Sequence, residues 1–242
     1  GTNGKGSISS FVSSGLRCLG IKAGITTSPH LISWCERICV NDQMITHTEL
    51  QERLSSLKPI IDKYHLTPFE SLIASALEYF RLQKVELLVL EVGLGGRLDA
   101  TTAHPFRPII AMGGIGLDHC EQLGNSLEDI AKEKASVIAP GSILITSKQD
   151  PKVERILKSV VAKQNGEIHF VQPLSNDWVL GLHGEIQKQN AAVALKALES
   201  LGLYGWNIDK KKIRKGFSQA KWPGRLQRAK WKNKALFIDC AH

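Results

Sequence analysis

Several short stretches of the chain are apolar at nearly every position rather than at every second or third one. They cover residues 85–93, 107–116, 141–147 and 234–242. A continuous apolar run of this length is typical of a strand covered on both faces of its sheet. We therefore expect these stretches to be interior strands.

Between these strands, apolar residues recur at the spacing of an amphipathic helix. The predicted helices cover residues 68–83, 126–138, 150–164 and 187–202, and another begins near Ile8. Ser126 and Asp129 have the spacing of a capping box. Pro151 suits a first helical turn, and Gly202 suits a helix C-terminus. Alternating strands and helices predict an α/β fold in which helices cover both faces of a parallel sheet.

Residues 25–45 follow neither pattern. They carry turn signals and short apolar alternation, with no helical periodicity. We expect a long loop that leads into a hairpin. A loop of that length in a compact domain is usually functional.

The first residues predict a phosphate-binding loop. Gly4, Lys5, Gly6 and Ser7 lead directly into the first predicted helix. The unpaired N–H groups of a helix N-terminus favour an anion, glycines allow close approach, lysine adds charge and a hydroxyl can reach Mg²⁺. Because Gly6 separates Lys5 from Ser7, the match to the usual phosphate-loop pattern is imperfect, and an ordinary glycine-rich turn is the alternative.

Acidic residues and a histidine follow two of the predicted strands. Glu91 lies near the end of one strand, and Asp118 and His119 follow the next. Ligands of parallel sheets bind at the carboxyl ends of strands, where such side chains suit Mg²⁺. The alternatives are a carboxylate that caps a helix, for Glu91, and a structural role for His119.

Composition places the chain among globular proteins. It has 242 residues, 43% of them hydrophobic and 22% charged, which is enough for one large domain or two modest ones. No apolar stretch is long enough to span a bilayer, so we expect no membrane partner. The cysteines are scattered and odd in number, Cys18, Cys35, Cys39, Cys120 and Cys240. This predicts reduced thiols in a cytoplasmic protein.

The positive charge is local. The net charge is +8, and residues 210–234 hold eleven lysines and arginines and no acid. Such a run suits nucleic acid, small anionic substrates or a plain solvated face. Trp222 and Trp231 have the chemistry to stack on bases, but no nucleic-acid-binding module is present. We therefore expect no nucleic-acid partner.

A set of motifs carries a family resemblance over essentially the whole chain. In order, these are GTNGKGS, TTSPHL, LTPFE, LEVGLGGRLDAT, GLDHCEQLG with SLEDIAKEKA, QKQNAAVAL, WPGRLQ and DCAH. The chain resembles the dihydrofolate synthase/folylpolyglutamate synthase family of Mur-ligase-like, ATP-dependent amide ligases. The resemblance implies a P-loop mononucleotide-binding α/β domain followed by a smaller α/β domain.

The same resemblance implies domain boundaries. Residues 1–221 would be the ATP- and pterin-binding domain without the strand that normally precedes the phosphate loop. Residues 222–242 would be a linker and the first strand of a truncated C-terminal domain. On this basis we expect a fragment that is not a competent ligase by itself.

The resemblance also assigns roles to residues. The implied ATP contacts are Gly4, Lys5, Gly6, Ser7, Asn190, Arg225 and Asp239. The implied Mg²⁺ ligands are Ser28, Glu91 and His119. The implied pterin-lining residues are Thr67, Pro68, Phe69, Glu70, Leu98, Asp99 and Ala100. The implied catalytic residues are Lys5, His119 and a carbamylated Lys134, although the helix pattern alone puts Lys132 and Lys134 on a solvated, charged face.

The implied activity is the addition of L-glutamate to dihydropteroate, to folate polyglutamate chains, or to both, through an acyl phosphate. ATP and Mg²⁺ would be required, the folate substrate would be dihydropteroate or tetrahydrofolate, and we expect a monomer. Another Mur-ligase-like amide ligase and a P-loop NTPase without ligase activity are the alternatives. Thr102, Ser136 and Cys240 depart from the family pattern, which has asparagine, glycine and glycine at these positions.

Overall fold

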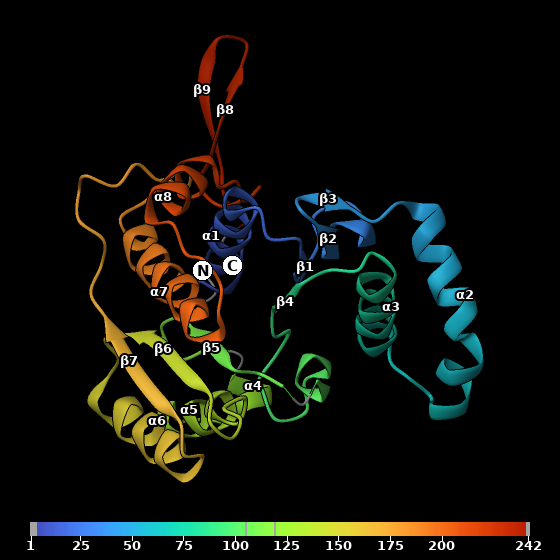
Figure 1. Ribbon diagram of the computed structural model, residues 1–242, viewed down its shortest axis with the longest axis horizontal. Helices are drawn as coiled ribbons and strands as arrows, with labels where there is room; N and C mark the ends of the chain where they lie inside the picture. The colour runs from blue at the N-terminus through green and yellow to red at the C-terminus, as the bar shows by residue number, and fades with distance from the viewer. Residues whose placement is uncertain (1–3, 105, 119, 241–242) are drawn as a thin grey trace.

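The computed structural model describes residues 4–104, 106–118 and 120–240 (Figure 1). His119 therefore lies outside the described residues. The first half contains α1 (Lys5–Leu19), β1 (Ala23–Thr26), η1 (Trp34–Arg37), β2 (Ile38–Val40), β3 (Gln43–Met44), α2 (His47–Tyr64), α3 (Pro68–Leu82), β4 (Leu87–Leu90) and η2 (Ala100–Ala103). The second half contains β5 (Ile109–Met112), α4 (Cys120–Leu123), α5 (Leu127–Ala135), β6 (Ile143–Ser147), α6 (Pro151–Lys163), β7 (Glu167–Val171), α7 (Ile186–Ser200), η3 (Leu201–Tyr204), α8 (Lys210–Gln219), β8 (Gln227–Trp231) and β9 (Lys234–Ile238).

The strands form a mixed sheet, a parallel sheet and a hairpin. In the first sheet the order is β3-β2-β1-β4, and β1 pairs parallel with β4 and antiparallel with β2. In the second sheet β5, β6 and β7 are all parallel. Helices pack along these strands, α7 on one side of the second sheet and α5 and α6 on the other (Figure 1). The predicted α/β class, with its parallel strands, is confirmed.

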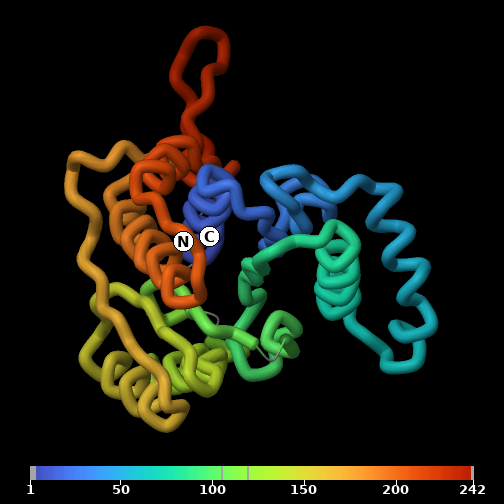
Figure 2. The backbone as a smooth tube through the Cα atoms, viewed as in Figure 1, coloured from blue at the N-terminus to red at the C-terminus, as the bar shows by residue number. Residues whose placement is uncertain are grey.

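Helix α1 is held between α7 and α8 by close packing. Figure 2 traces α1 beside these two helices. The rings of Phe11 and Phe217 are 5.0 Å apart, centre to centre. A Cβ on Gly15 would lie 2.4 Å from a methyl group of Leu198, and one on Gly216 would lie 2.4 Å from the carbonyl oxygen of Ser14. Since nothing larger than glycine fits at these contacts, the position of α1 is tightly fixed.

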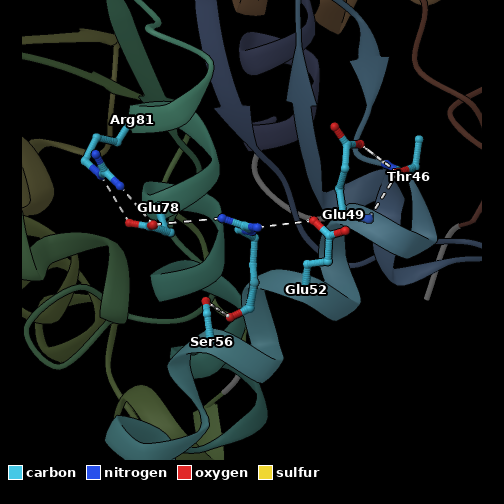
Figure 3. A network of polar contacts seen from close by, with 7 residues as sticks. Thr46, Glu49, Glu52, Ser56, Glu78 and Arg81 are labelled. Atoms are coloured by element: carbon cyan, nitrogen blue, oxygen red, sulfur yellow. Dashed lines mark hydrogen bonds and ion pairs between the residues drawn. The ribbon is translucent and has the colours of Figure 1, made fainter.

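Helices α2 and α3 carry a polar network at their contact (Figure 3). Thr46 and Glu49 form a reciprocal capping box at the start of α2. Further along, the Arg53 guanidinium lies 4.0 Å from the Glu78 carboxylate of α3, which also pairs with Arg81 at 3.0 Å. Partly exposed ion pairs of this kind contribute little stability. They orient the two helices, whereas buried apolar residues such as Leu72 and Phe80 form the core beneath.

The predicted helices are confirmed, with corrections at two helix ends. The helix predicted over 126–138 ends at Ala135. Helix α7 does not stop at Gly202 but continues as the tighter helix η3. The residue that ends this segment is Gly205, whose φ of 86° is left-handed. Both positions are glycine, so local sequence could not decide between them. No helix in the described part of the chain is long and apolar enough to cross a membrane.

Four strand predictions need correction. The runs at 85–93 and 107–116 were expected to be interior strands, but β4 and β5 lie at the edges of their sheets and are only partly buried. The region 25–45 was expected to be a loop before a hairpin. The hairpin is present as β2 and β3, but the region starts inside β1. The run at 234–242 does form a strand, β9, but this strand is not covered on both faces. It pairs antiparallel with β8 in a protruding hairpin whose residues are exposed (Figure 1).

Candidate nucleotide and substrate site

The N-terminus of α1 has the geometry of an anion site. Gly4 precedes the helix with a left-handed φ of 75°, and among the described residues no side-chain cap is present at this end. The first-turn N–H groups therefore have no partner within the helix. A Cβ on Gly4 would lie 2.3 Å from Oδ1 of Asn190, whose Nδ2 donates to Gln187 Oε1 at 3.1 Å. The predicted loop residues and Asn190 are thus brought together, and Lys5 supplies a cation at the same place.

Glu91 lies at the carboxyl end of β4, close to this helix end. It is only 6% exposed, and among the described residues its carboxylate accepts one hydrogen bond, from the Ser28 N–H at 3.4 Å. Burial raises the pKa of Glu91 to about 7, although the charges of Lys5 and Arg225 and the Ser28 N–H oppose the shift. Three segments that are distant in sequence therefore meet at one buried carboxylate.

The Glu91 site fits a hard divalent cation. The Glu91 carboxylate lies beside the backbone N–H of Ser28, a residue that also carries a hydroxyl, and oxygen ligands are those that Mg²⁺ prefers. A buried carboxylate with one long hydrogen bond gains from a nearby cation. The third predicted ligand, His119, lies outside the described residues. Within the residues described, no three His, Cys, Asp or Glu side chains are grouped closely enough to hold a metal.

Lys134 faces the site, and Lys132 faces solvent. Both lie on α5. Burial and the nearby charge of Lys5 lower the pKa of Lys134, and Asp118 opposes this shift. Lys132 is exposed and lies 3.9 Å from Asp129, one helical turn away. The expectation from helix periodicity, that Lys134 belongs to a solvated face, is therefore wrong, because this side of α5 turns toward Lys5.

The glycine-rich loop after β4 is organised by Asp99. This side chain is 9% exposed. One carboxylate oxygen accepts the N–H groups of Gly93 and Leu94, at 2.9 and 3.0 Å. The other accepts the N–H and the hydroxyl of Thr101, at 3.0 and 2.6 Å. Asp99 thus closes its own loop with both oxygens, which leaves it little capacity for a ligand.

The two segments predicted to line a pterin pocket meet at Gly93. A Cβ on Gly93 would lie 2.8 Å from Phe69 Cζ and 3.1 Å from Asp99 Oδ2. Thr67 and Glu70 form the capping box of α3, in which Glu70 Oε2 accepts the Thr67 N–H at 2.8 Å. These two side chains therefore fix the start of α3, and Phe69 projects toward the loop.

The remaining predicted pterin residues differ in exposure. Pro68 occupies the first turn of α3, and Ala100 begins η2 beside it. Leu98 is 82% exposed. Leu98 is thus a large apolar side chain exposed on the loop that Phe69 contacts, and it is suited to contact an aromatic ligand.

The predicted ATP contacts near the C-terminus lie in and beside residues 221–226, which we call the linker. Arg225 is close enough to Glu91 for its charge to oppose the rise that burial causes in the pKa of Glu91. Asp239 is exposed, and its Oδ2 accepts the Leu226 N–H at 2.8 Å. The Cys240 N–H donates to the Gly224 carbonyl at 2.7 Å. These bonds hold both ends of the β8–β9 hairpin to the linker.

The residues that depart from the family pattern are accommodated locally. Thr102 Oγ1 donates within the loop, to the carbonyls of Asp99 and Gly96. Ser136 Oγ donates to the Glu133 carbonyl at 2.6 Å. Cys240 Sγ would lie 2.6 Å from a Cβ on Gly224, so its side chain fills the space beside that glycine. None of the three removes a contact described above.

A cavity of about 530 Å³ opens beside the site. Lys5, Glu91 and Lys134 line one end of it. The remainder runs between β4 and β5, along apolar side chains that include Leu88 and Ile110. Sequence reasoning missed this cavity, because it arises from the distance between two strands. It also missed Gln187, which lies three residues before Asn190 and was recognisable from helix spacing.

The chain was compared with known proteins by family, sequence and structure. No family model matches it. The curated dihydrofolate synthase/folylpolyglutamate synthase of Bacillus subtilis (strain 168) is 31% identical over 274 residues, which cover all of this chain and 63% of that protein. A folylpolyglutamate synthase from Mycobacterium tuberculosis, complexed with ADP and AMPPCP, has a TM-score of 0.89 at 30% identity and is covered to 62%.

A folylpolyglutamate synthase in complex with AMPPCP and folate also matches all of this chain. Its TM-score is 0.90 at 26% identity, over 66% of that protein. The chain thus spans less than two thirds of the length of these relatives. Sequence and fold agree over the full length of the chain, which is therefore a homologue of these dihydrofolate synthase/folylpolyglutamate synthases and corresponds to part of their length.

Proposed function

We propose that this chain is the ATP- and pterin-binding part of a ligase that adds L-glutamate to dihydropteroate, to folate polyglutamate chains, or to both. The observation that carries the proposal is the meeting of three features at one sheet edge. These are the uncapped N-terminus of α1 with Lys5, the buried Glu91 beside Ser28, and the half-buried Lys134. An anion-binding helix end beside a carboxylate suits a nucleotide with its divalent cation.

The chemistry begins with activation of a carboxylate. An oxygen of the substrate carboxylate attacks the γ-phosphorus of ATP, the bond to the bridging oxygen breaks, and ADP leaves. The first-turn N–H groups of α1 and the ammonium of Lys5 stabilise the charge that develops on the phosphoryl oxygens. Mg²⁺, held by Glu91 and Ser28, would neutralise further phosphate charge when bound.

The second step forms the amide. The neutral α-amino group of glutamate attacks the acyl carbon, the C–O bond to phosphate breaks, and inorganic phosphate leaves. ATP, the folate and glutamate are all anionic, which accords with the net charge of +8.

Lys134 is proposed to act as a carbamate. Carbamylation joins a neutral amine to CO₂ and releases a proton, and the lowered pKa of Lys134 favours the neutral amine. The product is an anion where a cation stood before. That change favours a divalent cation in the neighbourhood of Lys5 and Glu91.

The domain boundaries remain part of the proposal. Residues 1–221 would form the nucleotide- and pterin-binding domain. Residues 222–242 would form a connecting segment and the start of a second domain. Strands β4 and β5 lie at the edges of their sheets and line the apolar cavity along their length. This cavity would accommodate the strand that the family resemblance places before the phosphate loop. We therefore do not assign the apolar part of this cavity to the pterin.

The test is ADP release by the full-length gene product. It compares dihydropteroate with tetrahydrofolate, each with and without L-glutamate. The proposal predicts sustained ADP release only when a folate substrate and glutamate are both present. Equal ADP release without them would favour the alternative, a P-loop NTPase that has no ligase activity.

A further inference from the structure

The indole of Trp222 lies against the first turn of α1. A Cβ on Gly6 would lie 2.6 Å from Trp222 Cζ2 and 2.8 Å from Nε1, closer than real Cβ atoms come to their neighbours. Gly6 is helical, and its φ is not positive. The backbone conformation therefore does not require glycine at position 6. The indole requires it, because no side chain fits beneath it.

A second contact fastens the same part of the chain to the same helix. Ser10, one turn after Gly6, is buried, and its Oγ donates to the Lys221 carbonyl at 3.0 Å. Residues four apart share a helix face. Lys221 and Trp222 are thus tied to one face of α1, and Trp222 also packs on the core that contains Ile8 and Phe11.

The linker connects this contact to the rest of the site. Arg225, three residues after Trp222, acts electrostatically on Glu91. A Cβ on Gly224 would meet Cys240 Sγ at 2.6 Å and Leu31 Cδ1 at 3.4 Å. One short segment therefore contacts the phosphate helix, the loop that carries Ser28 and the base of the β8–β9 hairpin, and acts electrostatically on the buried carboxylate.

We propose that Trp222 is a positioning residue that holds the first turn of α1 at its contact with Gly6 and couples that turn to the linker. It does not need to touch the nucleotide, since it acts through the backbone of Gly6. The inference rests on the proposed function in one respect, that the nucleotide phosphates bind at α1. Nucleotide binding and the position of residues 221–226 then depend on each other.

The decisive experiment is a double-mutant cycle in the full-length gene product. Calorimetry measures the affinity for AMPPCP with Mg²⁺ in wild type, Gly6→Ala, Trp222→Ala and the double variant. Gly6→Ala should weaken binding by about tenfold or more, because overpacking displaces the loop backbone. Trp222→Ala makes room for the added methyl group, so the double variant should bind more tightly than Gly6→Ala alone. Additive losses would overturn the proposal, since residues without contact show additive effects.

A matched control separates positioning from stability. Gly15→Ala places a methyl group against Leu198 on the same helix, far from the phosphate end. It should lower the melting temperature and leave the affinity for AMPPCP unchanged. A comparable loss of affinity in Gly15→Ala would show that any packing defect in α1 suffices, which would overturn the proposal.

Tryptophan fluorescence provides a test that does not depend on the Gly6 variant folding. AMPPCP with Mg²⁺ should change the emission of the wild type and of Trp231→Phe, which alters an exposed hairpin residue. Trp222→Phe should lose that change while it retains most of the affinity. An unchanged signal in Trp222→Phe would contradict the inference. Failure of the wild type to bind AMPPCP would instead contradict the proposed function, and the inference that rests on it would fail as well.

Discussion

Two buried carboxylates, eight residues apart, behave differently. Asp99 is 9% exposed and accepts four hydrogen bonds from its own loop. Glu91 is 6% exposed and, within the part of the chain that the structure describes, accepts a single N–H, at 3.4 Å. Similar burial therefore has different consequences, because within the described residues Asp99 has several partners that compensate for the loss of water and Glu91 has one weak partner.

The comparison distinguishes a structural acid from a ligand-binding one. A buried carboxylate that is satisfied by backbone N–H groups stabilises a loop, whatever binds nearby. A buried carboxylate with one weak partner, a raised pKa and cations within electrostatic range is a candidate for function. The region of Glu91 should therefore govern activity, and the region of Asp99 should govern stability.

The largest effect is expected on the Glu91 side. Lys5→Ala should lower ADP release by the full-length gene product by a factor on the order of 10²–10³, because one preorganised electrostatic contact to the phosphoryl group is lost. The melting temperature should stay close to that of the wild type, since Lys5 is not part of the apolar core. Near-normal turnover would show that the N-terminus of α1 does not form the phosphate site.

Lys134 and Lys132 make a matched pair on α5. Lys134→Ala should abolish most activity and regain part of it with small added carboxylates, which replace the carbamate charge. Lys132→Ala should be nearly silent, because this residue is exposed and makes only a loose ion pair. Equal effects of the two changes, or an unmodified Lys134 in native mass spectra of active, bicarbonate-treated enzyme, would contradict the carbamate.

Asp99→Asn should mainly affect stability. The amide keeps one acceptor oxygen and replaces the other with an NH₂ group. That NH₂ group then faces N–H or O–H donors of the loop, and it cannot accept their hydrogen bonds. The free energy of unfolding should fall by about 2–3 kcal/mol, the cost of leaving buried polar groups unsatisfied. Urea denaturation measures this change. If Asp99→Asn instead keeps full stability and loses folate binding, Asp99 belongs to the substrate site rather than to the loop.

The smallest effect is expected at two equivalent helix caps. Thr67→Ala on α3 and Thr46→Ala on α2 each remove a capping box, at a cost of about 1 kcal/mol. Only Thr67→Ala should also raise the KM for the folate substrate, because Phe69, two residues after Thr67 on α3, packs against the loop after β4. If both variants leave that KM unchanged, the start of α3 does not shape the pterin site.

Sequence reasoning recovered the elements that local patterns determine. Helix periodicity located α3, α5, α6 and α7, and Ser126 caps α5 at its predicted start. The short β1 and β7 were not predicted, and their strand state is stabilised by pairing with neighbouring strands. Likewise, the exposure of β9 depends on what packs against it rather than on its apolar composition.

The site shows the same division. The phosphate loop, Glu91 and Lys134 were identified from motifs, yet the side on which Lys134 faces depends on how α5 packs. The hydrogen bonding of Asp99 depends on how its own loop folds, and the contact of Trp222 with Gly6 depends on the distance between segments remote in sequence. No local pattern encodes such distances.

The central claim is that Glu91 is reserved for a divalent cation and Asp99 is not. The most direct measurement is Mn²⁺ binding, followed by electron paramagnetic resonance, in the full-length gene product saturated with AMPPCP. Binding should strengthen as the pH rises through about 7, where Glu91 loses its proton. Glu91→Gln should lose this binding at temperatures where the protein stays folded, and Asp99→Asn should retain it. Unchanged Mn²⁺ affinity in Glu91→Gln would contradict the account.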